Sequence, residues 1–264
     1  MGYPESIIKK RPEDSHKGMF GTVKLLCGSE QYTGAAMLSV SGALRSGCGM
    51  VKLFTAETAA LPVRTRYPEA IICPTEEFSR ESGDSAVIGC GIGRGLDGIL
   101  EGIFSMLSVP AVIDADGINF IASNIDILGE IKTPFVLTPH PKEFARITGS
   151  CIGSTLEERK KAAAEFASEH GCVMLLKGHE TVVASPEGRV YINTTGCSAL
   201  AKGGSGDVLA GVIGSLLAQG YAPFDAASLG AYIHGAAGET AAERYGLHGA
   251  LPQFLPEEIG RLLG

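Results

Sequence analysis

The chain has 264 residues, of which 45% are hydrophobic, and its formal net charge is −7 at pH 7. This length and apolar content suffice for a large core, and we expect residues 1–264 to form one domain. The acidic balance without a basic stripe argues against binding to nucleic-acid polymers or anionic membranes, which both need clustered Lys and Arg. A small anionic ligand stays compatible with this charge.

The sequence contains no run of 18 apolar residues and no cationic leader followed by an apolar stretch. We therefore expect a cytoplasmic protein without a membrane span. The cysteines form no CxxC pair, are odd in number and mostly sit in or beside apolar runs, which predicts buried free thiols. They are Cys27, Cys48, Cys73, Cys90, Cys151, Cys172 and Cys197.

Short apolar runs that end in Gly, Pro or Asp predict buried strands of a mainly parallel sheet. In the first half of the chain these runs are 22–27, 50–54, 70–73, 86–89 and 111–113. Apolar residues three and four apart predict helices at 34–47, 98–107 and 116–128. The first strand, the first helix and the second strand make a βαβ unit.

The second half continues the alternation of strands and helices. Strands are predicted at 133–137, 172–176, 181–184 and 189–193, the last two forming a hairpin at an antiparallel edge. Helices are predicted from Pro141, after a capping box at 154–157, from 208, at 225–245 and at 256–263. The alternation predicts an α/β fold with three layers, a mainly parallel central sheet flanked by helices.

Residues 203–207, Gly-Gly-Ser-Gly-Asp, directly precede the apolar helical pattern that starts at Val208. We call residues 203–207 the glycine loop and expect it to cap that helix. Unpaired N–H groups at a helix start, approached closely over glycines, predict a cradle for a phosphoryl group. Asp207 stands at its lip, where it could accept a proton from a substrate hydroxyl. A plain helix cap is the alternative.

Four further polar residues follow predicted strands, and each has two interpretations. His140, held between prolines, is either a surface turn residue or a substrate contact. Lys177 is either a solvated strand end or a functional cation. Asp114 and Asp116 either cap a helix or bind magnesium through water.

Several common active-site patterns are absent. Gly89–Gly93 begins like a dinucleotide fingerprint, but the third glycine of GxGxxG is missing, which argues against a nicotinamide-type Rossmann site. No GxxxxGK[ST] motif occurs, which excludes a Walker P-loop. No Ser-His-Asp signature, HExxH motif or zinc-ligand spacing occurs, so hydrolase and zinc-enzyme interpretations have no support.

Seven motifs follow one another in a match that runs from about His16 to beyond His234, nearly the whole chain. They are His16-Lys-Gly with Gly21, Gly28-Ser with Tyr32-Thr-Gly-Ala-Ala36, Gly89-x-Gly-x-Gly93, Asp114-Ala-Asp116, Thr138-Pro-His-Pro-x-Glu143, Lys177-Gly178 and Gly203-Gly-Ser-Gly-Asp207. Because it carries these motifs in this order, the chain resembles the ADP- or ATP-dependent NAD(P)H-hydrate dehydratases. The resemblance implies a ribokinase-like fold. It also implies the repair of hydrated NADH or NADPH (NADHX, NADPHX), whose S epimer is dehydrated at the expense of a nucleotide phosphate.

The resemblance also implies roles for individual residues. The hydrate would contact Ala35 or Ala36, one of Gly91 and Gly93, His140 and Asp207. The adenine nucleotide would contact Lys177, Gly178, His179, Glu180, Thr181 and Gly206, beside the cradle residues Gly203, Gly204 and Ser205. Asp207 would deprotonate the ring hydroxyl, and Mg²⁺ would bridge the phosphates. The side chains that would hold a metal are not predicted.

Partners follow from the same resemblance. His179 and Glu180 stand where relatives vary, so they do not assign the nucleotide; we expect ADP because stand-alone bacterial-type chains resemble that subgroup. Members are often fused behind an epimerase domain, which this chain is too short to carry, so a separate epimerase is expected to act upstream. A homo-oligomer, a tetramer by resemblance, is expected, and residues 226–242 would be either core or interface.

Two rival functions are weighed against this one. A vitamin kinase of the same fold, acting on hydroxymethylpyrimidine, pyridoxal or hydroxyethylthiazole, would use the same glycine loop. The Thr138-Pro-His-Pro-x-Glu motif argues against it. A nucleotide-sensing protein without turnover would keep the loop but would not need Asp207.

Overall fold

The computed structural model describes residues 3–93 and 95–264. They contain a nine-stranded sheet with the strand order β3-β2-β1-β4-β5-β6-β7-β8-β9. Strands β1 to β7 pair in parallel, and β8 and β9 add an antiparallel hairpin at one edge, which confirms the predicted sheet. The strands are β1 (Thr22–Leu26), β2 (Met50–Phe54), β3 (Ile71–Cys73), β4 (Ser85–Ile88), β5 (Ala111–Ile113), β6 (Phe135–Leu137), β7 (Val173–Leu176), β8 (Val182–Ala184) and β9 (Val190–Ile192).

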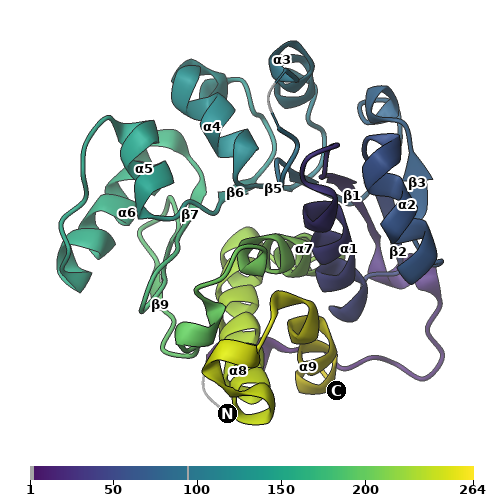
Figure 1. The fold of residues 1–264 in the computed structure, drawn as a ribbon. Coiled ribbons are helices and arrows are strands. Elements are labelled where there is room, and N and C mark those ends of the chain that lie inside the picture. The colour runs from purple at the N-terminus through teal and green to yellow at the C-terminus, as the bar shows by residue number, and fades with distance from the viewer. Residues whose placement is uncertain (1–2, 94) are drawn as a thin grey trace.

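Helices cover both faces of the sheet, giving the three predicted layers (Figure 1). One face carries α1 (Thr33–Arg45), α2 (Glu57–Arg66), α7 (Ser205–Ala218), α8 (Pro223–Gly249) and α9 (Leu255–Leu262). The other face carries α3 (Asp97–Ser105), α4 (Asp116–Ser123), α5 (Pro141–Thr148) and α6 (Leu156–His170). Because successive strand residues point to opposite faces, Leu25 packs in the first core and Leu26 in the second. Both cores therefore need continuous apolar strands.

The position of α7 is fixed by close backbone contacts. A side chain at Gly211 would overlap the Ser39 carbonyl of α1, and one at Gly42 would overlap the Val208 carbonyl of α7. A side chain at Gly214 would collide with Val87 of β4. Glycine at these points lets α7 lie directly against both α1 and the sheet. The first turn of α7 is thereby held at the carboxyl ends of the strands.

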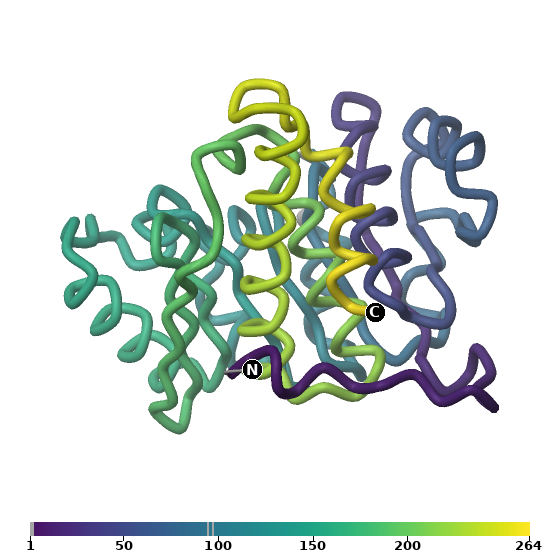
Figure 2. Tube along the Cα trace, turned by 90° about the horizontal axis from the view of Figure 1, so that it is seen from below, coloured from purple at the N-terminus to yellow at the C-terminus, as the bar shows by residue number. Residues whose placement is uncertain are grey.

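The N-terminal segment crosses the opposite end of this helical layer (Figure 2). Lys9 Nζ donates to the Gln219 carbonyl at 3.0 Å, just beyond the end of α7, and Arg11 donates to the Gly47 carbonyl at 3.3 Å, just beyond α1. These cations satisfy carbonyl groups that helix ends leave unpaired. The segment thus closes the end of the layer that lies away from the glycine loop.

Several predicted boundaries were wrong. Helix α7 begins at Ser205 and not at Val208, so Asp207 lies inside its first turn. The capping box of α6 is Thr155 with Glu158, one residue later than predicted. The helix predicted over 116–128 is α4 followed by a separate 3₁₀ turn, Ile125–Gly129.

Helix α2 was not predicted, because Pro62 stands inside it and its polar face carries Arg64 and Arg66. The cysteine prediction holds for Cys27, Cys48, Cys90 and Cys172, which are buried, whereas Cys73 and Cys197 are partly exposed and Cys151 is exposed. Among the described residues, the helices are all too short or too polar to cross a membrane.

Candidate active site

The predicted site residues lie where parallel strands end and α7 begins. Gly91 and Gly93 follow β4, Asp114 follows β5, His140 follows β6 and Lys177 follows β7. The carboxyl ends of parallel strands are the usual ligand-binding edge of such sheets. The glycine loop lies at the same edge of the sheet, because α7 begins there.

The glycine loop presents unpaired hydrogen-bond donors. The N–H of Ser205 donates to the Lys202 carbonyl, and that of Val208 donates to the Gly204 carbonyl, each at 3.3 Å. Within residues 3–93 and 95–264, the N–H groups of Gly206 and Asp207 have no such acceptor. The Ser205 hydroxyl is also buried without a partner in that part of the chain. Such a helix start, with two free amides and a hydroxyl, is suited to binding an anion.

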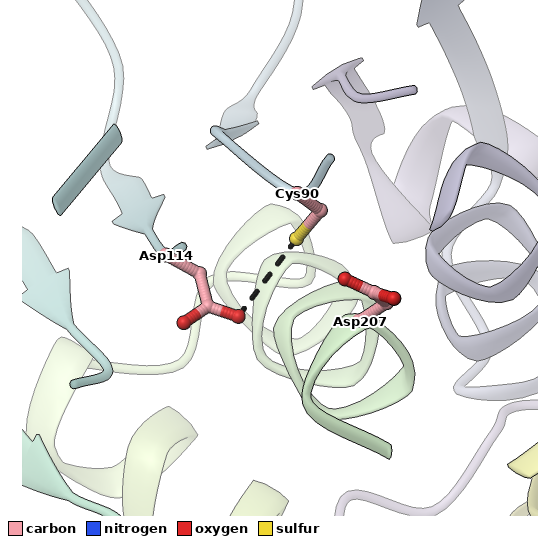
Figure 3. Close-up of side chains that lie close together, drawn as sticks. All are labelled: Cys90, Asp114 and Asp207. Carbon is pink, nitrogen blue, oxygen red and sulfur yellow. Dashed lines mark hydrogen bonds between the residues drawn. The ribbon is translucent and has the colours of Figure 1, made fainter. Parts of the chain in front are cut away.

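Asp207 lies in the first turn of α7, next to two other buried polar groups. One ligand atom each of Cys90, Asp114 and Asp207 lies within 4.8 Å of the others (Figure 3). Burial raises the pKa of Asp207 to about 7, and the Asp114 charge adds to the rise, while Lys177 and a hydrogen bond from Cys90 oppose it. A carboxylate with a pKa near neutrality is suited to general-base catalysis.

Lys177 forms an ion pair with the buried Asp114 carboxylate and is itself only partly exposed, so it is not a solvated strand end. Its ammonium lies 2.8 Å from Asp114 Oδ1 and 3.9 Å from Glu143 Oε2, and its side chain is 21% exposed. Burial lowers the pKa of Lys177, but the Asp114 and Glu143 carboxylates outweigh burial and raise the pKa above its usual value. Lys177 is therefore a fixed cation. A Cβ at Gly206 would lie 3.3 Å from Lys177 Nζ, so this charge stands directly beside the glycine loop.

His140 is the N-cap of α5, in a capping box with Glu143. The Glu143 N–H donates to His140 Nδ1 at 3.1 Å, and the His140 N–H donates to Glu143 Oε2 at 2.8 Å. The side chain of His140 remains 44% exposed. His140 therefore has a structural role as the cap of α5. Its ring also faces solvent at the ligand-binding edge, so a substrate contact stays a prediction.

Ala35 and Ala36, in the first turn of α1, lie beside the turn after β4 that carries Gly91 and Gly93. A Cβ at Gly91 would lie 2.6 Å from the Cβ of Ala35, so this loop and α1 touch. Ala36 is fully buried, while Ala35 is partly exposed, which favours Ala35 as the one that reaches a ligand. Gly93 donates its N–H to Asp116 Oδ2 at 2.9 Å.

The segment 178–181 forms the rim of the site between β7 and β8. Thr181 donates to the Gly178 carbonyl at 3.0 Å, which closes the turn. Arg159 of α6 donates to the carbonyls of His179 and Glu180, at 2.6 and 3.0 Å. The His179 side chain itself is 95% exposed. Contacts to backbone carbonyls thus fix this rim, while the His179 side chain stays in solvent.

Sequence reasoning missed three contributors to the site. Asp114 was weighed only as a cap or a magnesium ligand, and its ion pair with Lys177 joins residues 63 positions apart. Cys90 was counted only as a buried thiol. His234, buried on α8, donates from Nε2 to the Ser205 carbonyl at 2.9 Å and so supports the start of α7. Burial lowers the pKa of His234 to about 4, which keeps the ring neutral.

Asp114 and Asp116 do not cap α4. The N-cap is Ala115, and Asp116, in the first turn, accepts from the Gly93 N–H and the Asn119 side-chain amide. Asp114, Asp207 and the Cys90 thiol each offer one ligand atom within 4.8 Å of the others, but a thiol is a poor ligand for magnesium and Asp114 is already paired with Lys177. Magnesium bound through water at these carboxylates stays a prediction.

Known proteins share this architecture. An ADP-dependent (S)-NAD(P)H-hydrate dehydratase from Neisseria meningitidis serogroup B is 39% identical over 252 residues, which cover 93% of this chain and 85% of that protein. Relatives named bifunctional NAD(P)H-hydrate repair enzyme, from Moorella thermoacetica and Gloeobacter violaceus, are longer. The chain spans about half of their length, 52% and 48%.

Two solved structures match almost the whole chain. A crystal structure of the ADP/ATP-dependent NAD(P)H-hydrate dehydratase from Bacillus subtilis, co-crystallized with ATP/Mg²⁺, gives a TM-score of 0.86 at 30% identity, covering 98% of this chain and 94% of that one. A ribokinase-like superfamily protein from Enterococcus faecalis V583 gives 0.85 at 28% identity, covering 98% and 92%. The predicted ribokinase-like fold is confirmed. With residues 23–261 also matching the family model for NAD(P)H-hydrate dehydratase, the chain belongs to that family.

Proposed function

We propose that the protein is an ADP-dependent dehydratase for the S epimer of NADHX and NADPHX, producing NADH or NADPH, AMP and phosphate. The observation that carries this proposal is the Asp207 carboxylate, with a pKa of about 7, one position from the unpaired Gly206 N–H. A base and an anion cradle on adjacent residues are what phosphoryl transfer to a hydroxyl requires. The 39% identity to an ADP-dependent dehydratase supports ADP as the donor.

In the proposed reaction Asp207 accepts the proton of the hydroxyl on the hydrated nicotinamide ring. The hydroxyl oxygen then bonds to the β-phosphorus of ADP, and the bond from that phosphorus to the oxygen kept by AMP breaks. The ring C–O bond breaks next, phosphate leaves with the oxygen, and loss of a proton from the neighbouring ring carbon forms the double bond. Water is thereby removed from the hydrate and added to ADP.

The surrounding residues support these steps. Free amides of Gly206 and Asp207 and the Lys177 ammonium would stabilise charge on the transferred phosphoryl group. The rim segment 178–181 would contact the nucleotide, with Gly203 and Gly204 at the loop entrance. Ala35, the Gly91 turn and His140 would contact the hydrate. Magnesium, with which the Bacillus subtilis enzyme was co-crystallized together with ATP, would accompany the nucleotide phosphates.

The reaction is tested by absorbance at the reduced-nicotinamide band. The protein is mixed with chemically hydrated NADH, magnesium and either ADP or ATP, beside a sample without nucleotide. We expect a rise that depends on nucleotide and is larger with ADP. A folded protein that gives no rise with either nucleotide would refute the proposal. Phosphorylation of a hydroxymethylpyrimidine, pyridoxal or hydroxyethylthiazole by that protein would then establish the vitamin-kinase alternative.

A further inference from the structure

Cys90 lies between the two carboxylates at the centre of the site. Its side chain is fully buried in the turn after β4, and its Sγ donates to Asp114 Oδ2 at 3.9 Å (Figure 3). The same sulfur atom and one Asp207 oxygen are within 4.8 Å of each other. In Figure 3 the sulfur points into the space between the end of β5 and the start of α7. In this structure the S–H group donates to Asp114, and the Asp207 carboxylate, within 4.8 Å of the same sulfur, is the second carboxylate that the S–H group can turn towards.

The thiol is a donor throughout the neutral pH range. A hydrogen bond with Cys27 and complete burial raise the pKa of the Cys90 thiol far above its usual value, and the Asp207 and Asp114 charges raise it further. A thiol carries one proton and can point it at only one acceptor at a time; the Cys27 sulfur is a weak acceptor, so the two carboxylates compete for that proton. Asp114 already receives Lys177 at 2.8 Å, whereas Asp207 has no other side-chain donor among the described residues.

We propose that Cys90 is a positioning residue for the base: its S–H donates to ionised Asp207 before reaction and turns to Asp114 once Asp207 has taken the substrate proton. The inference rests on the proposed function, because it assumes that Asp207 is the base. No bond is made or broken in this step; the S–H group rotates about the Cβ–Sγ bond. The thiol thereby favours the ionised form of Asp207 without leaving an unpaired donor when Asp207 is protonated.

Other charged groups face Asp207 from the surrounding elements. Asp114 and Asp116, at the end of β5 and the start of α4, raise the pKa of Asp207 by repulsion, and Lys177 at the end of β7 lowers it. His234 on α8 stays neutral above about pH 4 and contacts the Ser205 carbonyl. None of these groups is a donor to the Asp207 carboxylate that could replace the thiol. Loss of the thiol alone should therefore raise the pKa of Asp207.

The test titrates Asp207 in the protein without substrate or nucleotide. The ¹³C signal of its carboxyl group, assigned by its absence in Asp207→Asn, is followed from pH 4 to pH 9 in wild type, Cys90→Ala and Cys90→Ser. We expect the Cys90→Ala midpoint to rise by about half a unit or more, as loss of one hydrogen bond predicts. Cys90→Ser, which keeps a donor, should titrate at or below the wild-type midpoint. Cys172→Ala, which removes a buried thiol at the start of β7, is the matched control and should change nothing.

The pH dependence of kcat/KM gives a second readout. Cys90→Ala should lose about threefold at pH 6 and little at pH 9, because its acid limb moves to higher pH. An unchanged or lower Asp207 midpoint in Cys90→Ala, or equal midpoints in the Ala and Ser variants, would overturn the inference. Wild-type protein without dehydratase activity would instead overturn the proposed function, and the titration of the resting protein would still decide what Cys90 does to Asp207.

Discussion

The centre and the rim of the site are organised in different ways. At the centre, Asp207, Cys90, Asp114 and Lys177 are held by burial and by one another, with Asp114 only 2% exposed. At the rim, residues 178–181 are held through the backbone carbonyls of His179 and Glu180 by Arg159, and the His179 side chain extends into solvent. Burial strengthens electrostatic effects, so charge changes at the centre should alter chemistry and stability. Side-chain changes at the rim should alter little.

The largest expected effect comes from removing the base. Asp207→Asn should lower turnover by about 10² or more, because the ring hydroxyl loses its proton acceptor. Nucleotide affinity should stay within a few-fold, since the amides of the glycine loop are kept. Turnover is measured from the reduced-nicotinamide absorbance and affinity by calorimetry with ADP. Turnover close to that of the wild type would remove Asp207 from the catalytic role.

Breaking the central ion pair should be the next largest effect. Lys177→Met leaves the Asp114 carboxylate buried without its closest partner and should lower the free energy of unfolding by about 3 kcal/mol. Lys177→Met combined with Asp114→Asn removes both charges and should recover most of that loss, but not activity. Urea unfolding of the three variants measures this. If Lys177→Met had the same free energy of unfolding as wild type, the Lys177–Asp114 ion pair would not be what stabilises the centre of the site.

Ionisation of Asp207 should lower the free energy of unfolding at high pH. Its folded-state pKa of about 7 exceeds an unfolded value of about 3.9, so the unfolded chain releases the proton first as pH rises. Wild type therefore loses stability from about pH 4 to pH 7, and Asp207→Asn should not. At pH 8 we expect the variant to be more stable by about 1–3 kcal/mol, with no difference at pH 4. Denaturant unfolding of both proteins at pH 4 and pH 8 measures this difference. If Asp207→Asn were more stable than wild type by the same amount at pH 4, the cause would be packing and not charge.

The smallest effects should separate two histidines. His140→Ala should raise the KM for the hydrate about tenfold, and more than the KM for ADP, because we assign the half-exposed His140 ring to the hydrate and the rim segment 178–181 to the nucleotide. His179→Ala should change both constants less than twofold, since its side chain is 95% exposed. Steady-state kinetics with each substrate varied tests the pair. If His140→Ala raised both constants equally, His140 would not belong to the hydrate side.

Much of the fold was predictable because its strands are short and apolar, and because the segments between them have apolar residues at helical spacing. Boundaries failed where local signals conflict: Ser205, Gly206 and Asp207 are poor helix formers, yet the packing of α7 on α1 extends the helix through them. Helix α2 was missed since Pro62 breaks its pattern.

The contents of the site were predictable only where one segment carries them. The glycine loop, with Asp207, is contiguous in sequence, and its free amides follow from a helix start. The contacts among Cys90, Asp114 and Lys177 depend on the strand order of the sheet. β5 lies beside β4, with β6 between β5 and β7, and this order brings together residues as far as 87 positions apart, Cys90 and Lys177. No local pattern encodes that adjacency.

The close contact between α1 and α7 sets a limit for protein engineers. Replacing helical glycine by alanine is a standard way to raise thermal tolerance, worth up to about 1 kcal/mol per site. Gly42 and Gly211 would be tempting targets in such a campaign, as both lie inside helices. Here an added methyl group would meet a main-chain carbonyl of the facing helix. A mutagenesis library designed to raise the melting temperature of this enzyme should therefore keep both glycines. A substitution at either one would push α1 and α7 apart and displace the end of α7 that carries the glycine loop.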